Sequence, residues 1–129
     1  MKETIKHHYF PHVITGTVKP GLKKGKSTGA RTANLNITLA KDLPPGLYTA
    51  VVKVGKERFF GLLYYGYNSI SDKDCLEVHI LDFSKNIYGK KITVTTLYFL
   101  RPPKKFKTKK ALVDQIKKDL KMAQRLTKG

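Results

Sequence analysis

Hydrophobic and polar residues alternate along most of this chain, which is the pattern of strands that bury one face and expose the other. Leu35, Ile37 and Leu39, for example, alternate with polar neighbours. The alternating runs are short, and glycine, proline and charged residues separate them, as is typical of antiparallel strands joined by turns. The pattern predicts six strands: His12–Val18, Thr32–Leu39, Leu47–Val54, Arg58–Tyr65, Cys75–Phe83 and Lys91–Leu100.

Turn-forming residues lie between these strands. The segment Gly21–Gly29 is rich in glycine and lysine and predicts a loop. Pro44-Pro45-Gly46 predicts a turn, and Gly55-Lys56 predicts a hairpin between the third and fourth strands. Tyr88-Gly89 precedes the last strand, which should end at Arg101-Pro102-Pro103 because proline cannot extend a ladder.

The last segment of the chain predicts a helix. Thr108 is a candidate N-cap, and apolar residues recur after it at helical spacing with lysines on the opposite side. We expect this helix to cover an end or a face of the sheet. Six short strands and one helix favour an all-β fold, an antiparallel barrel that is closed or partly closed, forming one domain over residues 1–129.

Composition bounds the class of protein. The chain has 129 residues, of which 40% are hydrophobic, and this fits one globular domain. No apolar run approaches the ~18 residues that span a membrane, and Met1–Phe10 lacks the apolar centre of a signal peptide. The lone Cys75 cannot form an internal disulfide, which suits a reducing compartment. We therefore expect a cytoplasmic protein that does not bind membranes, and we expect it to be a monomer.

The net charge of +17 has two interpretations. A basic surface binds nucleic acid by releasing counterions from phosphates, but a lysine-rich solvated surface gives the same charge. Only four of the 26 basic residues are arginine, whose fork suits specific phosphate and base contacts, and the lysines are spread along the chain. We therefore expect no specific nucleic-acid binding, whereas the same field attracts a smaller polyanion such as ATP.

Two apparent motifs fail on spacing. Gly25-Lys26-Ser27 is similar to the end of a P-loop, but Gly21 is one residue too close, and a strand follows where a P-loop requires a helix. Cys75 and His79 share a strand face, but four residues of strand separate them by about 13 Å. That separation excludes a direct nucleophile–base pair.

Three longer segments occur in order along the chain. They are GTVKPGLKKGKSTGARTANL at Gly16–Leu35, LEVHILDFSKNIYG at Leu76–Gly89, and LRPPKKF at Leu100–Phe106 before the terminal helix. Together they resemble the riboflavin kinase family, segment by segment, over about residues 12–124. The resemblance implies a six-stranded, Greek-key-like antiparallel barrel of the riboflavin kinase type with a C-terminal helix. It also implies an enzyme that phosphorylates riboflavin to FMN with ATP and Mg²⁺.

The resemblance gives Glu77 a catalytic role. From its position in a strand alone, Glu77 would be a solvated residue on an exposed face. In the family, the glutamate of this segment is the general base that deprotonates the terminal ribityl hydroxyl. Thr32 and Asn34 carry side-chain oxygens on one strand face, and hard oxygen ligands suit Mg²⁺. By resemblance these two residues hold the metal.

The resemblance also implies the substrate contacts. For the nucleotide these are Gly21, Lys26, Thr32, Ile80, Asp82 and Tyr88, and for the flavin they are Arg101, Lys104 and Phe106. The chain departs from the family at Arg31, where the family has proline, and at Pro103, where it has glutamate. Asn68-Ser69-Ile70 replaces an Asn-Pro-Thr or Arg-Pro-Thr segment. The base and the metal ligands are intact, so these departures bear more on flavin affinity than on phosphoryl transfer.

Two alternatives remain open. One is a barrel that binds a flavin or a nucleotide without turnover, and the other is a basic barrel that binds nucleic acid. The joint presence of Glu77, Thr32 and Asn34 favours the enzyme over the first alternative. The scattered lysines, with no aromatic stacking motif among them, argue against the second.

Overall fold

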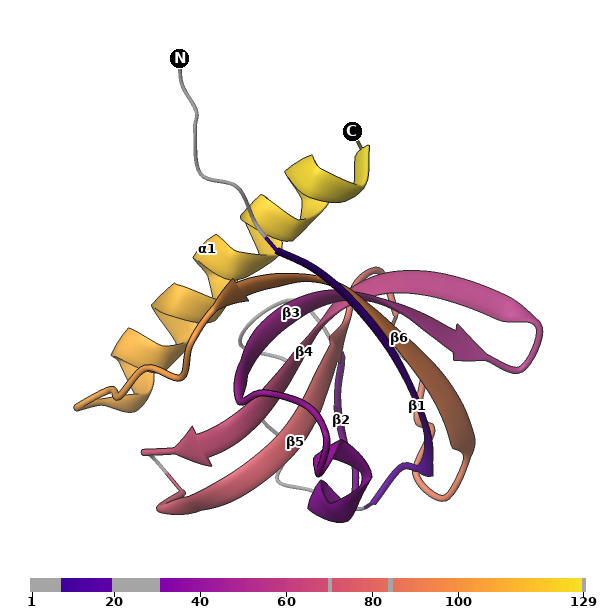
Figure 1. Ribbon diagram of the computed structural model, residues 1–129, viewed down its shortest axis with the longest axis horizontal. Coiled ribbons are helices and arrows are strands. Elements are labelled where there is room, and N and C mark those ends of the chain that lie inside the picture. The colour runs from indigo at the N-terminus through magenta and orange to yellow at the C-terminus, as the bar shows by residue number, and fades with distance from the viewer. Residues whose placement is uncertain (1–7, 20–30, 70, 84, 129) are drawn as a thin grey trace.

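The computed structural model describes residues 8–19, 31–69, 71–83 and 85–128, and of residues 31 and 126–128 it describes the backbone alone. The described residues form a curved sheet flanked by one long helix (Figure 1). The elements, in chain order, are β1 (His8–Thr17), β2 (Arg31–Asn34), the 3-10 helix η2 (Ile37–Ala40), β3 (Gly46–Val54), β4 (Glu57–Asn68), β5 (Lys73–Ile80), β6 (Lys91–Arg101) and α1 (Lys109–Lys128).

The six strands form one antiparallel sheet with the order β1-β6-β3-β4-β5-β2. This confirms the predicted class of six antiparallel strands followed by a helix. The sheet curves like a barrel, but it is not closed, because β1 and β2 are its two edges. A single bridge between Lys19 and Asn34 joins the chain after β1 to β2.

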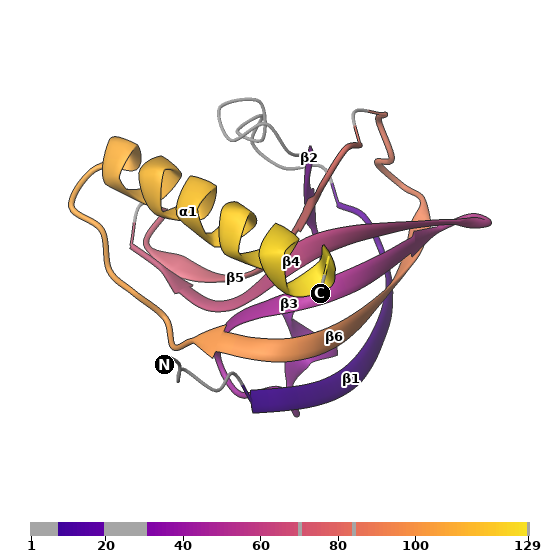
Figure 2. The same cartoon turned by 90° about the horizontal axis from the view of Figure 1, so that it is seen from above.

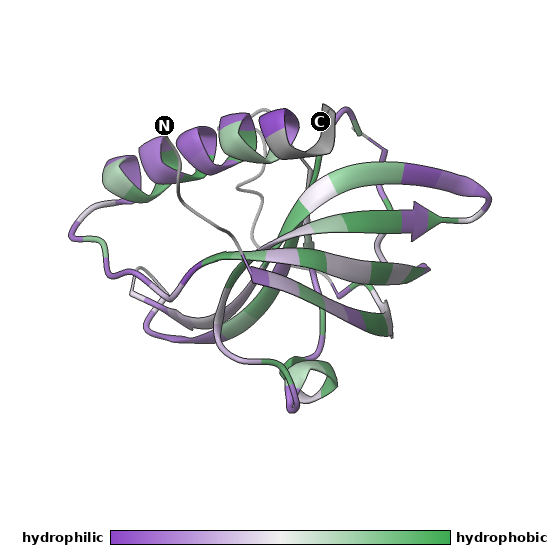
Figure 3. Cartoon of the chain, turned by 45° about the horizontal axis from the view of Figure 1, so that its top comes forward, coloured by the Kyte–Doolittle hydropathy of each residue, from purple (hydrophilic) through white to green (hydrophobic). Residues whose placement is uncertain are grey.

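The concave side of the sheet holds the main hydrophobic core. Alternate residues of β3, β4, β5 and β6 point into it, among them Val52, Leu63, Val78 and Val94, and each is fully buried. Apolar and polar positions therefore alternate along the strands (Figure 3). The hairpin predicted at Gly55-Lys56 joins β3 to β4, and Gly55 has a φ of +61°, a left-handed conformation that suits glycine.

Helix α1 lies along the outer face of the sheet (Figure 2). Leu120 and Ala123 pack there against Leu47 of β3 and Leu62 of β4, which forms a second, smaller core. Thr108 caps the helix, because its hydroxyl oxygen accepts a hydrogen bond from the backbone N–H of Ala111 at 3.1 Å. The cap was predicted, and of the two positions expected for the helix, an end or a face of the sheet, the structure shows the face. No helix in the described part of the chain is long and apolar enough to cross a membrane.

Two predicted strands are shorter than their hydropathy patterns suggested. The strand predicted at Thr32–Leu39 ends at Asn34, because Asn36 accepts a hydrogen bond from the backbone N–H of Thr38 and caps η2. The alternation of Leu35, Ile37 and Leu39 therefore does not belong to one strand. The strand predicted at Cys75–Phe83 ends at Ile80, and Asp82 has a φ of +56° in the following turn.

Candidate functional site

Two rows of side chains cross the outer face of the sheet beside α1. Residues directly opposite each other in an antiparallel ladder point to the same face, so the register determines these rows. One row contains Asn34, Glu77, Tyr64 and Leu47, and the other contains Thr32, His79, Leu62 and Thr49. Each row starts with polar residues on β2 and β5 and continues onto mostly apolar or aromatic residues on β4 and β3.

A pocket lies at the apolar end of these rows. Its walls come from β3, β4 and β5, from the segment that follows β6, and from α1: Leu47, Leu62, Tyr64, Tyr67, Asn68, Ser69, Glu77, His79, Arg101, Lys104, Phe106, Leu112, Ile116 and Asp119. The cavity between these walls has a volume of about 30 Å³, which is room for a few water molecules, within about 440 Å³ of empty space that includes open solvent. A larger ligand therefore needs a wall of the pocket to move outward, or it must lie partly outside the pocket.

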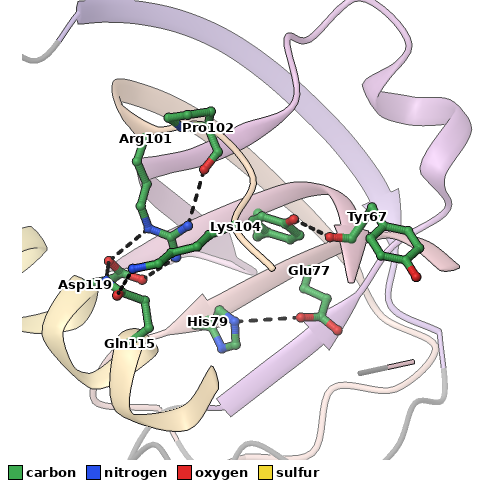
Figure 4. Close-up of polar contacts among 9 residues, drawn as sticks. Tyr67, Glu77, His79, Arg101, Pro102, Lys104, Gln115 and Asp119 are labelled. Carbon is green, nitrogen blue, oxygen red and sulfur yellow. Dashed lines mark hydrogen bonds and ion pairs between the residues drawn. The ribbon is translucent and has the colours of Figure 1, made fainter. Parts of the chain in front are cut away.

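Glu77 stands where the pocket meets β2. Its side chain is 23% exposed, and its Oε1 lies 3.9 Å from Nε2 of His79 (Figure 4). Asn34 is directly opposite Glu77 in the ladder between β2 and β5. The carboxylate is therefore reachable from the pocket and is next to the two candidate metal ligands on β2.

His79 is buried beneath this edge of the pocket. Its Nδ1 lies 3.1 Å from the hydroxyl oxygen of Thr32, so the two side chains are hydrogen-bonded. Burial lowers the pKa of His79, although the carboxylates of Glu77 and Asp119 oppose that shift. Strand β5 can approach β4 closely here because Gly61 has no Cβ, and a Cβ would lie 2.3 Å from the carbonyl oxygen of His79.

A buried ion pair forms the wall opposite Glu77. The guanidinium of Arg101 donates to both carboxylate oxygens of Asp119, from Nη2 at 2.8 Å and from Nε at 3.4 Å (Figure 4). Asp119 is only 2% exposed, and the side-chain amide of Gln115 also donates to it, at 3.0 Å. This fork-like pair ties the end of β6 to the middle of α1.

The segment after β6 is held across the pocket mouth at two points. The Ser69 hydroxyl donates to the carbonyl of Phe106 and accepts from its backbone N–H, at 3.0 and 2.8 Å. Lys104 donates to the side-chain oxygen of Gln115 at 3.1 Å, and its ammonium lies 5.9 Å from the centre of the Phe106 ring. These contacts hold the segment against the end of β4 and against α1.

The structure brings together most of the residues predicted to form the site. Glu77 and the three predicted flavin contacts line the same pocket, and Thr32 and Asn34 lie next to Glu77 on the same face. The predicted nucleotide contacts are more dispersed: the Ile80 side chain lies in the core, Asp82 is exposed in a turn, and Tyr88 packs against the core. Gly21 and Lys26 lie outside the described residues.

Several polar residues of the site were not predicted as site residues. Among them, His79, Gln115 and Asp119 each have one partner far away in the sequence, respectively Thr32, Lys104 and Arg101, and no local pattern reveals these contacts. Asp119 did carry one signal, a carboxylate close to the apolar positions of an amphipathic helix. The rejection of Cys75 as a nucleophile fits the structure, because burial raises the pKa of its thiol to about 12.

The side chains at the edge of the pocket have the chemistry of a Mg²⁺ site. Thr32 offers a hydroxyl oxygen and Asn34 an amide oxygen, and both residues are half-buried. Magnesium prefers such hard oxygen donors, is often held by only a few protein groups and keeps several waters. The residues present therefore fit a magnesium ion that a phosphate-bearing ligand helps to bind.

Sequence comparisons identify a family and several proteins that are similar to this chain. The model of a family described as "Flavokinase: Riboflavin kinase" matches residues 8–127. The "Bifunctional riboflavin kinase/FMN adenylyltransferase" of Listeria monocytogenes is 36% identical over 85% of this chain and 36% of that protein. The "RNA-binding riboflavin kinase RibR" of Bacillus subtilis is 31% identical over 84% of this chain and 48% of that protein. The chain thus spans between about a third and a half of these relatives.

Solved structures have the same fold. The riboflavin kinase of Trypanosoma brucei matches with a TM-score of 0.61 and 20% identity, over 92% of this chain and 80% of that protein. A Streptococcus pneumoniae structure described as a macrolide-efflux protein matches with a TM-score of 0.70 and 29% identity, over 88% of this chain and 38% of that one.

Proposed function

Because this chain belongs to the riboflavin kinase family, we propose that it transfers the γ-phosphoryl group of ATP to the 5'-hydroxyl of riboflavin and so produces FMN and ADP. One observation carries the proposal. Glu77 lies between an apolar pocket on one side and two oxygen-bearing side chains on the other. That order is the one required by a hydroxyl acceptor, a base and a metal-bound phosphate donor.

The pocket suits the flavin. Its floor is formed by Leu47 and Leu62, and Phe106, Leu112 and Ile116 face the floor from the segment after β6 and from α1. Apolar and aromatic side chains of this kind cover the faces of a planar ring system. The ribityl chain would then extend along the outer face toward Glu77, and the segment around Phe106 would move outward to admit the ring.

Glu77 acts as the general base in this proposal. Its carboxylate accepts the proton of the ribityl hydroxyl while that oxygen attacks the γ-phosphorus, and the bond to the β-phosphate oxygen breaks to release ADP. Glu77 meets the geometric requirement for this role because it lines the pocket and its side chain is partly exposed. The proton stays on the Glu77 carboxyl group while FMN and ADP leave, and it is then released to solvent.

Thr32 and Asn34 would hold the magnesium ion. The ion would neutralise phosphate charge during transfer. Thr32 and Asn34 would direct their oxygens to the phosphate side of Glu77, and Thr32 would also contact the nucleotide. The other proposed nucleotide contacts are Gly21, Lys26, Ile80, Asp82 and Tyr88, of which Ile80 can contribute only through its backbone because its side chain is in the core.

We also propose an oligomeric state, a location and a range of partners for this chain. The chain would act as one domain and as a monomer in the cytoplasm, without specific nucleic-acid binding and without membrane binding. The dispersed lysines and the shortage of arginine support a general attraction for anions such as ATP. The RNA-binding relative in Bacillus subtilis makes nucleic acid the partner class to compare in binding experiments.

The candidate metal ligands give the first test. Thr32→Val and Asn34→Ala should each raise the Mg²⁺ concentration needed for half-maximal FMN formation by about tenfold or more, because each removes an oxygen donor. The rate is measured by separating FMN from riboflavin, and melting is recorded for every variant. Thr15→Val, on an exposed position of β1, is the control and should behave like the wild type. Unchanged Mg²⁺ dependence in both variants would assign these side chains a structural role.

A further inference from the structure

His79 contacts both halves of the proposed reaction centre. It is opposite Thr32 in the ladder between β2 and β5, and its side chain is 6% exposed. Its Nδ1 lies 3.1 Å from the Thr32 hydroxyl, and its Nε2 lies 3.9 Å from Glu77 Oε1 (Figure 4). The ring therefore spans the gap between a candidate metal ligand and the candidate base, and it has no role in the reaction as described so far.

The surroundings of the ring favour one tautomer. A neutral imidazole carries one proton, so one nitrogen donates and the other accepts. If Nδ1 carried the proton, Nε2 would present a lone pair to the carboxylate of Glu77, and the two would repel. If Nε2 carries the proton, the N–H dipole points at that carboxylate, and Nδ1 is free to accept the proton of the Thr32 hydroxyl. Asp119, the other carboxylate near the ring, is already paired with Arg101.

We propose that His79 is a positioning residue that, with its proton on Nε2, accepts the Thr32 hydroxyl hydrogen bond and orients Glu77. The inference rests on the proposed function. Because the Thr32 hydroxyl donates its hydrogen to Nδ1 of His79, the lone pairs of the Thr32 oxygen remain available to a cation. In the opposite tautomer, an N–H from His79 would occupy one of those lone pairs. The His79 ring thus orients the Thr32 hydroxyl, and its Nε2–H attracts the Glu77 carboxylate and restricts its position.

The tautomer is measured directly in the ligand-free protein. Long-range ¹⁵N–¹H correlation spectra distinguish a protonated ring nitrogen from an unprotonated one, and the spectrum of His79→Asn identifies the signals of His79. We expect a protonated Nε2 and an unprotonated Nδ1. A protonated Nδ1 would overturn the assignment, whether or not the protein makes FMN, so this outcome is separate from failure of the proposed function.

Two amide substitutions test the consequence. The side chain of His79→Asn places an oxygen near the position of Nδ1, where it can accept from Thr32, whereas His79→Gln places its amide near the position of Nε2. We expect His79→Gln to weaken Mg-ADP binding by about tenfold or more in calorimetry and to raise the Mg²⁺ requirement of turnover. His79→Asn keeps the acceptor for Thr32 and should retain the Mg-ADP affinity, but its turnover should fall because it has no donor directed at Glu77. The exposed control His8→Gln should match the wild type in both measurements. Equal Mg-ADP affinities of the Asn and Gln variants, both intact or both impaired, would overturn the proposal.

Discussion

Replacing Glu77 with glutamine is expected to lower the turnover number for FMN formation by about 10²–10⁴-fold, the usual contribution of a general base. The amide keeps the shape of the side chain and its position in β5, but it cannot accept the proton of the ribityl hydroxyl. Affinities for riboflavin and Mg-ATP should change much less, because the lost interaction matters mainly in the transition state. Initial rates and ligand titrations of the same preparation separate the two effects.

The control for this experiment is Glu57→Gln, which removes a carboxylate from an exposed position at the start of β4. It changes the net charge by the same amount and should leave the rate unchanged. An undiminished rate for Glu77→Gln would remove Glu77 from the mechanism. A large fall in the melting temperature of that variant would instead mark Glu77 as a structural residue.

Replacing Arg101 with methionine is expected to lower the free energy of unfolding by about 3 kcal/mol. The carboxylate of Asp119 is 3% exposed and would keep only Gln115 as a hydrogen-bond donor in the described contacts. Removing one partner of a buried ion pair typically costs about 3–5 kcal/mol, because the other charge stays buried without compensation. The side chain of Arg101 is 21% exposed, so we expect a loss at the lower end of that range. Equilibrium unfolding in urea measures the change.

The chain provides a matched pair for comparison. Lys110 and Asp114 form an exposed ion pair on α1, with side chains 85% and 52% exposed, so Lys110→Met should cost less than about 0.5 kcal/mol. The double variant Arg101→Met with Asp119→Leu should recover part of the stability, because it leaves no buried charge. If Arg101→Met cost no more than Lys110→Met, the ion pair would not fasten α1 to the sheet.

The strands could be predicted because each buries one face, so hydrophobic and polar residues alternate along it with a period of two. The pattern failed at Ile37 and Leu39, where the Asn36 side chain bonds to the local backbone and a 3-10 turn replaces the ladder. It also failed after Ile80, where a left-handed Asp82 turns the chain. Both errors occurred at strand ends, where one side-chain contact or one dihedral angle outweighs the hydropathy pattern.

The candidate site was predicted unevenly for a related reason. Glu77 was found through its motif, since its position alone suggested a solvated residue. Asp119 and His79 were missed because one partner of each, Arg101 and Thr32 respectively, lies 18 and 47 residues away in the sequence. Arg101 was predicted to contact flavin, and that prediction stands untested. In the structure its guanidinium is hydrogen-bonded to Asp119, and Arg101 lines the pocket.

The most direct test of the account is the product that forms when the protein is incubated with riboflavin, ATP and Mg²⁺. Chromatography separates the flavins, and ADP is measured in the same samples. The account predicts equal amounts of FMN and ADP, with neither formed when riboflavin, nucleotide or divalent metal is omitted. Riboflavin that binds but never becomes FMN, with any nucleotide or divalent metal supplied, would contradict the account and would leave a flavin-binding protein without kinase activity.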